Sequence, residues 1–188
     1  MKKVLAIVLV IVLLLGGWFI MTQNNLVTLN EKINQSQGEI QTQLQRRNDL
    51  IPNLVSTVKG YAKHEKDVFT AVADARSKLA GTISSGDIEE INNANKEFES
   101  ALSRLLAITE NYPELKASTQ FTALQDELAG TENRIAYARN QYNQTVGQFN
   151  TAIQRFPASI VANMKGYSTR PYFEAEASAQ QVPQINFD

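Results

Sequence analysis

Residues 4–21 of this 188-residue chain read VLAIVLVIVLLLGGWFIM, a stretch without charge that directly follows Met1, Lys2 and Lys3. At the helical rise it is about 27 Å long, close to the hydrocarbon thickness of a bilayer. Trp18 stands near its end, where interfacial aromatic side chains anchor membrane helices. The stretch therefore predicts an N-terminal transmembrane anchor, which we place in residues 1–23.

A cleaved signal peptide begins in the same way, with a positive end and an apolar stretch. The apolar stretch here is longer than the usual signal-peptide core of about 7 to 15 residues, and no Ala-x-Ala-like site follows Met21. We therefore expect a retained signal anchor in the cell membrane, with a secreted protein released by cleavage as the alternative. Because Lys2 and Lys3 flank the anchor, the N-terminus is expected in the cytoplasm and the remaining domain outside it.

Charge and composition narrow the class of protein. The chain has 18 Lys and Arg against 19 Asp and Glu, a formal net charge of -1, and no basic run longer than the pairs Lys2-Lys3 and Arg46-Arg47. This balance gives no basic footprint for nucleic acid, so we expect no nucleic-acid partner. The chain has no cysteine, which excludes the N-terminal lipid modification of lipoproteins.

Apolar residues recur at alternating steps of three and four, the spacing at which packed helices meet. A first series, with Arg47 and Glu65 as its polar members, contains Leu44, Arg47, Ile51, Leu54, Val58, Tyr61, Glu65, Val68, Val72, Ala75 and Leu79. A second series contains Phe121, Leu124, Leu128, Thr131, Ile135, Ala138, Tyr142, Val146, Phe149, Ile153 and Phe156. Between them Ile91, Ala94, Phe98, Leu102 and Leu105 mark a shorter helix.

Punctuating residues separate these helices. A loop is expected over residues 81–86, with Asp87 as the N-cap of the next helix and Glu90 completing a capping box. Residues 111–113 close that helix, Ser118 can cap the following one, and Phe156-Pro157 ends it.

The first series is too long for one helix, because a rod over residues 26–79 would reach about 81 Å with nothing to cover it. Pro52 and the segment around Gly60 and His64 are the two candidate hinges. Either choice predicts an all-α fold, in which an antiparallel up-and-down four-helix bundle with long helices occupies residues 24–157. A partly irregular C-terminal tail, 158–188, follows the last helix back toward the membrane.

The sequence has few residues that could form a catalytic or metal site. A di-metal centre in a helical bundle needs Glu-x-x-His on two helices, and His64 is the single histidine. His64 next to Glu65 is more typical of a turn than of a general base. We therefore expect no catalytic residue, no metal and no cofactor, and predict that the protein is not an enzyme.

One group of charges is a candidate structural or recognition cluster: Arg46, Arg47, Asp49, Glu127, Glu132 and Arg139. Arg47 lies within an apolar series, and an unpaired buried charge costs several kcal/mol. We interpret the cluster mainly as an ionic lock between helices, with a binding site as the alternative.

The tail carries apolar and aromatic side chains beside Lys165 and Arg170, a mixture found in segments at membrane interfaces. Its members are Phe156, Ile160, Val161, Met164, Tyr167, Tyr172 and Phe173. The alternative is that the strip folds back onto its own helices.

Several motifs follow one another along the chain. Residues 43–55 read QLQRRNDLIPNLV, residues 58–65 read VKGYAKHE and residues 132–139 read ENRIAYAR. Together with Ala75-Arg76, Tyr142-Asn143 and Tyr172-Phe173-Glu174, in this order, they resemble the signature of the LemA family of bacterial membrane proteins. The resemblance covers nearly the whole chain and implies a membrane segment followed by a helical bundle. It implies no defined activity, although some relatives are associated with organelle membrane assembly.

These observations favour a membrane-anchored scaffold or adaptor that presents helical faces to other membrane or envelope proteins. A small-molecule-binding or enzymatic bundle that uses Arg47, Glu132 and Arg139 is the second hypothesis. The amide-rich stretches 35–45 and 140–154 could also pair two copies, so a homo-oligomer stays open.

Overall fold

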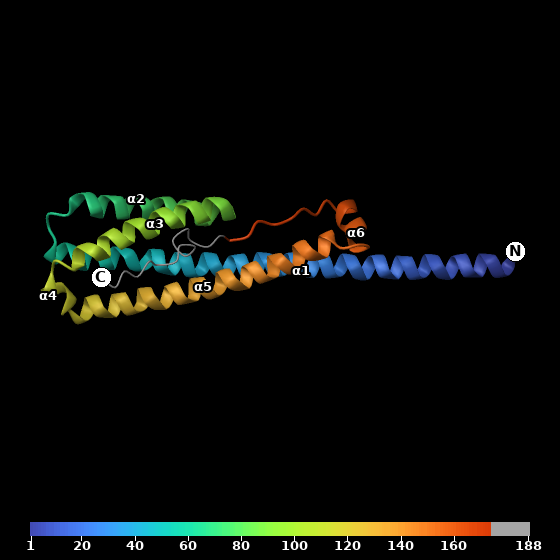
Figure 1. Cartoon of the computed structure of the whole chain (residues 1–188), viewed down its shortest axis with the longest axis horizontal. Helices are drawn as coiled ribbons and strands as arrows, with labels where there is room; N and C mark the ends of the chain where they lie inside the picture. The colour runs from blue at the N-terminus through green and yellow to red at the C-terminus, as the bar shows by residue number, and fades with distance from the viewer. Residues whose placement is uncertain (174–188) are drawn as a thin grey trace, which may run out of the picture. The chain divides into compact units, whose positions relative to one another are not determined.

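A computed structural model of the chain describes residues 1–173 and contains six helices there and no strand (Figure 1). The helices are α1 (Lys2–Tyr61), α2 (Lys66–Ser85), α3 (Ile88–Thr109), α4 (Pro113–Lys116), α5 (Thr119–Gln154) and α6 (Ala158–Met164). The prediction of an all-α fold is confirmed. The parts of the tail beyond Phe173, including Glu174 and Pro183, lie outside the described residues.

Helix α1 carries the apolar stretch at its N-terminal end. Within residues 1–173 it is the one helix long and apolar enough to cross a membrane, and none of its most apolar window is buried. The same helix continues without a break to Tyr61, so the apolar stretch and residues 24–61 are one element.

The chain reverses after α1, and the structure selects between the two candidate hinges. Pro52 lies inside α1 and is exposed, whereas α1 ends at Tyr61, one residue after Gly60. Residues 62–65 connect α1 to α2, and His64 is exposed in this turn. The break therefore falls near Gly60 and His64, and Pro52 is not a hinge.

Two compact units divide the described chain. Unit 1 contains Met1–Gly38 and Asn140–Pro171, and unit 2 contains Glu39–Arg139 with Tyr172 and Phe173. This division rests on packing, and the segment boundaries at residues 23 and 157 stay predictions. Each long helix, α1 and α5, contributes to both units.

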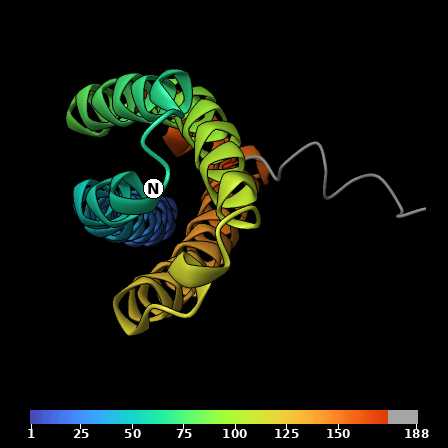
Figure 2. The same cartoon turned by 90° about the vertical axis from the view of Figure 1, so that its left-hand side faces the viewer.

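The core of unit 2 joins α1, α2, α3, α4 and α5. Figure 2 shows α2 and α3 as a neighbouring pair of green helices. The buried members of this core are Ile51, Leu54, Val58, Ala62, Phe69, Val72, Ala75, Leu79, Ala94, Phe98, Ala101, Leu105, Leu115, Phe121 and Leu128. Most belong to the apolar series read from the sequence, and Tyr61 is an exception because it is exposed at the end of α1. An up-and-down four-helix bundle over residues 24–157 stays a prediction.

The connection between α2 and α3 is shorter than expected. Residues 81–85 are helical, so the predicted loop is wrong over this span. Helix α2 ends at Ser85, and its C-cap residue Gly86 has a φ of 72°. Glycine adopts this left-handed conformation at little cost. Asp87 is the N-cap of α3, as predicted, since its Oδ1 accepts hydrogen bonds from the Glu89 and Glu90 N–H groups at 2.8 and 3.0 Å. The Glu90 carboxylate accepts a bond from the Ser85 hydroxyl at 3.2 Å, so the expected capping box takes a different form.

Replacing Asp87 with alanine is expected to lower the free energy of unfolding by about 1 kcal/mol, because two N–H groups of α3 lose their acceptor. Chemical unfolding of the detergent-solubilised chain, followed by circular dichroism, measures this loss. Asp74→Ala is the matched control, since Asp74 is exposed within α2. Equal stabilities of the two variants would contradict the capping role.

In unit 1, the segment after α5 returns as α6 and then binds along α5. Helix α6 ends with a Schellman motif: the Tyr167 N–H donates to the Ala162 carbonyl at 3.0 Å, and Gly166 has a φ of 72°. The Asn150 side chain then donates to the Arg170 carbonyl at 2.9 Å and accepts from the Arg170 N–H at 2.8 Å. The Phe149 and Tyr167 rings meet edge to face at 5.6 Å. Residues 158–164, expected to be weakly patterned, thus form a helix, and the chain beyond it is held by side-chain contacts.

Tyr142 fastens the end of this segment and gives it a pH dependence. Its hydroxyl donates to the Pro171 carbonyl at 3.0 Å. Burial raises the pKa of Tyr142 above the ordinary tyrosine value, and the positive charge of Arg170 opposes part of this rise. Because the unfolded chain then releases the tyrosine proton first, the stabilisation is fully present below about pH 10 and is lost as the pH rises further.

Tyr142→Phe is therefore expected to cost about 1 kcal/mol of unfolding free energy at neutral pH, through the lost hydrogen bond. Above about pH 10 the difference between the wild type and this variant should shrink, because phenylalanine cannot ionise. Unfolding curves of both proteins from pH 7 to 11 measure the effect, and lysine titration is common to both. A difference that is constant with pH would contradict the role of burial.

Candidate functional site

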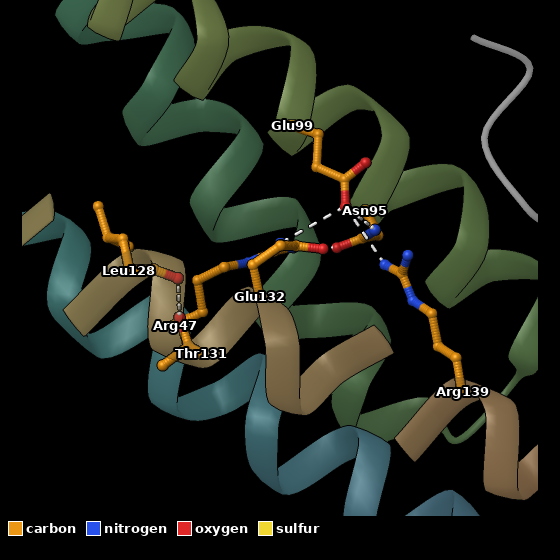
Figure 3. A network of polar contacts seen from close by, with 7 residues as sticks. All are labelled: Arg47, Asn95, Glu99, Leu128, Thr131, Glu132 and Arg139. Carbon is orange, nitrogen blue, oxygen red and sulfur yellow. Dashed lines mark hydrogen bonds and ion pairs between the residues drawn. The ribbon is translucent and has the colours of Figure 1, made fainter. Parts of the chain in front are cut away.

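Five polar side chains from three helices of unit 2 form what we term the arginine–glutamate cluster. Arg47 comes from α1, Asn95 and Glu99 from α3, and Glu132 and Arg139 from α5 (Figure 3). The spacing of apolar residues on α1 places Arg47 on the face that packs inward, between Leu44 and Ile51. The cluster thus bridges three helices through one buried cation.

Arg47 is among the largest fully buried side chains of the protein. Its Nη1 donates to Glu132 Oε2 at 2.5 Å and lies 3.4 Å from Glu99 Oε1, while its Nη2 donates to the side-chain oxygen Oδ1 of Asn95. The guanidinium carbon also lies 5.1 Å from the centroid of the Phe98 ring. A cation over an aromatic face and paired with carboxylates is stabilised by both.

Glu99 is the centre of the cluster on α3. Its Oε1 accepts hydrogen bonds from Asn95 Nδ2 at 2.6 Å and from Arg139 Nη2 at 3.2 Å, beside the contact with Arg47. Arg139 lies with its guanidinium carbon 4.9 Å from the Phe173 ring centroid. Two arginines and two glutamates balance in charge, so the cluster avoids an uncompensated buried ion.

The Nε atoms of Arg47 and Arg139 are buried without a hydrogen-bond partner. Both belong to guanidinium groups whose terminal nitrogens are engaged and whose planes are near aromatic rings. The arrangement favours charge pairing and helix register over proton transfer, because the arginines already hold the carboxylates.

The structure brings only part of the predicted cluster together. Arg46 pairs with Glu127, but their side chains are 52% and 39% exposed, so this ion pair lies on the surface. Asp49 does not join either group, which corrects the prediction: it accepts a bond from the Gln45 side chain at 2.8 Å, one turn away on the exposed face of α1. Within residues 1–173 no three His, Cys, Asp or Glu side chains gather in a way that could hold a metal ion.

Sequence reasoning missed Asn95 and Glu99. The two residues are four positions apart on α3, a spacing common on solvated helix faces, and only their position beside Ala94 and Phe98 placed them near the core. Thr131 was read as a member of the apolar series, and it is buried with its hydroxyl donating to the Leu128 carbonyl at 2.7 Å.

A mainly apolar groove of about 280 Å³ lies beside the cluster. Leu102 and Leu106 of α3 line it opposite Leu128 and Ala129 of α5, and the Arg47–Glu132 ion pair lies at its edge. An apolar side chain or small molecule with a polar end matches this lining in chemistry.

The fold and the cluster define an all-α protein with an N-terminal helix able to span a membrane and a charge-balanced arginine–glutamate cluster around the buried Arg47. The chain belongs to the LemA family, whose model matches residues 36–187. This confirms the resemblance seen in the sequence motifs.

Sequence similarity to individual proteins supports the assignment to this family. The chain is 28% identical over 191 residues to magnetosome protein MamQ 1 of Paramagnetospirillum magneticum, covering 88% of this chain and 69% of the relative. It is 27% identical over 189 residues to magnetosome protein MamQ of Magnetospirillum gryphiswaldense, with the same two coverages. It is also 25% identical over 142 residues to protein LemA of Metamycoplasma hominis, covering 74% of this chain and 63% of that protein.

Proposed function

We propose that the chain is a single-pass membrane protein whose helical domain acts as a non-catalytic scaffold or adaptor. One observation carries the proposal: the apolar anchor and the first helix of the domain are a single uninterrupted helix, α1. A helix of 60 residues is about 90 Å long, so the helical faces that follow the anchor are joined to it without a flexible linker. Such a connection suits presentation of surfaces to partners.

The cluster and the relatives support a scaffold over an enzyme. The carboxylates of the arginine–glutamate cluster are paired with arginines, which leaves them poorly suited to act as bases. Three relatives are named magnetosome proteins, and we take this association with an organelle as support for work within a protein assembly at a membrane. A second copy of the chain counts among the possible partners.

Affinity purification of the tagged full chain from a detergent extract tests the scaffold. We expect partner proteins at stable ratios to the chain. Recovery of the chain alone, with a bound small molecule, would contradict the proposal and favour ligand binding.

The groove beside Arg47 supports a second candidate, a small-molecule-binding bundle. Leu106→Trp would fill the groove from α3. Native mass spectrometry of the purified chain should then show a bound molecule in the wild type and none in the variant. Identical spectra without added mass would remove this candidate.

Retention of the anchor and the orientation of the chain in the membrane can each be tested by experiment. Retention of residues 1–21 predicts an intact mass near 20.9 kDa in the membrane fraction, whereas a lighter, released form would support the secreted alternative. Protease added to intact cells should degrade the helical domain, because the lysines at positions 2 and 3 favour a cytoplasmic N-terminus. Full protection would reverse the proposed orientation.

A further inference from the structure

Helix α6 has an apolar face that the protein leaves uncovered. On the helix, Ile160 and Met164 are four residues apart and are 49% and 70% exposed, and Phe156, just before the helix, is 82% exposed. Val161 and Ala162, on the same short helix, are buried against the rest of the protein. The tail strip therefore divides: one part folds back onto the helices, and the other part stays exposed.

The exposed face lies in the same compact unit as the apolar anchor. Along α1, residues 1–17 are exposed, Trp18 and Phe19 are half-buried and Leu26 is buried, so packing against α1 begins where the apolar stretch ends. Arg170, shortly after α6, donates to the Asn30 side chain of α1 at 2.9 Å. Figure 1 shows α6 beside this part of α1.

The helical rise gives the distance of the Asn30 contact from the end of the apolar stretch. Asn30 is nine residues beyond Met21, which is about 14 Å along the helix axis. The headgroup region extends several ångströms beyond the hydrocarbon core on each side. The Arg170–Asn30 contact therefore lies just beyond the headgroups, whereas the half-buried Trp18 and Phe19 bring the packing against α1 to the level of the membrane interface.

The charge of the segment favours the same surface. Residues 140–171 contain no Asp or Glu, and their charged residues are Arg155, Lys165 and Arg170. Arg155 and Lys165 are exposed on either side of α6, next to Phe156 and Met164. Basic side chains that flank an exposed apolar face are attracted to anionic lipid headgroups.

We propose that α6, together with Phe156, is an interfacial membrane element: its apolar face enters the headgroup boundary of the bilayer that α1 spans. The partner that this apolar face binds is an anionic lipid surface. The inference rests on the proposed anchoring by α1 and adds a second contact between this protein and the same membrane. Insertion of these side chains removes exposed apolar surface from water and fixes the orientation of unit 1 against the bilayer.

The experiment uses the full chain in nanodiscs of phosphatidylcholine with phosphatidylglycerol. Because the chain has no cysteine, Met164→Cys provides a single site for an environment-sensitive fluorophore. If the face enters the bilayer, the apolar environment should shift the emission of this label to the blue, and brominated lipids should quench it. A label on Gln35→Cys, exposed on α1 and about 21 Å beyond Met21, should show neither effect.

Trp18, the single tryptophan, separates the inference from the proposed anchor. Quenching of Trp18 without quenching at position 164 would overturn the role of α6 and leave the anchor intact. Loss of both signals would overturn the anchor as well. Discs of phosphatidylcholine alone should weaken quenching at position 164 and leave Trp18 unchanged, and equal quenching in both discs would overturn the anionic preference.

A second substitution guards against an effect of the label. In the Met164→Cys background, Ile160→Asp should abolish quenching while Ile160→Leu keeps it, because only the aspartate places a charge on the apolar face. Both positions are exposed, so the circular dichroism spectrum should stay unchanged. Persistent quenching in the aspartate variant would count against insertion of this face.

Discussion

Replacing Arg47 with methionine is expected to lower the free energy of unfolding by about 3 kcal/mol. The substitution removes the buried cation that joins α1 to Glu132 of α5 and to Asn95 of α3, and it leaves the face of Phe98 without its guanidinium. Glu99 keeps Arg139 as a partner, and Glu132 is 46% exposed and can be hydrated, so the loss stays at the low end for a broken buried pair. Chemical unfolding of the full chain in detergent, followed by circular dichroism, measures it.

Arg46→Met is the matched control for Arg47→Met. The two arginines are neighbours on α1, but the Arg46–Glu127 ion pair is exposed, and exposed pairs contribute about 0 to 1 kcal/mol. Equal losses in the two variants would contradict a buried lock. The double variant Arg47→Met with Glu132→Leu should regain much of the stability, because no unpaired charge is then left and the Glu99–Arg139 pair is untouched.

The same variant also distinguishes a lock from a recognition site. An Arg47→Met protein that keeps its unfolding free energy but no longer recovers partners from a detergent extract would assign the arginine to recognition. Loss of stability together with loss of partners would assign it to the fold. The double variant with restored stability then asks whether partners return, which separates the two roles in a folded protein.

The apolar series predicted most of the core, because burial follows the spacing of side chains along a helix. Arg47 is the clearest case: its place between Leu44 and Ile51 predicted a buried cation in need of carboxylates, and Glu132, which pairs with it, was one of the two glutamates named in the cluster. Asp49 was wrongly included. It is only two residues from Arg47 in the sequence, but residues two apart on a helix point in different directions.

Glu99 and Asn95 could not be predicted from their own helix. Their spacing fits a hydrated face equally well, and the choice depends on how α3 is rotated against α1 and α5. The residues that carry the family resemblance include Arg47, Arg76, Glu132 and Arg139, and each of them joins helices of unit 2. Arg76, for example, donates to the Asn48 carbonyl at 3.1 Å. The motifs thus describe a packing arrangement more directly than an activity.

Phe98→Ala is expected to cost about 3 to 5 kcal/mol of unfolding free energy, the largest effect among these substitutions. Phe98 is fully buried on α3 within the core of unit 2, and its truncation leaves a cavity beneath the arginine–glutamate cluster. Chemical unfolding measures this loss. Tyr137→Ala on α5 removes an aromatic side chain that is largely exposed and should cost less than about 1 kcal/mol.

The contact between Arg47 and the Phe98 ring can be tested separately from the cavity that Phe98→Ala creates. Phe98→Leu keeps most of the apolar volume and is expected to cost about 1.5 kcal/mol, part of it from loss of the aromatic face beneath Arg47. A double-mutant cycle of Phe98→Leu with Arg47→Met should therefore show a coupling of about 1 kcal/mol, since the guanidinium has no ring to bind in one variant and the ring has no cation in the other. Strictly additive losses would mean that the ring supports the fold by packing alone, and that Arg47 is held by Glu132, Glu99 and Asn95 without it.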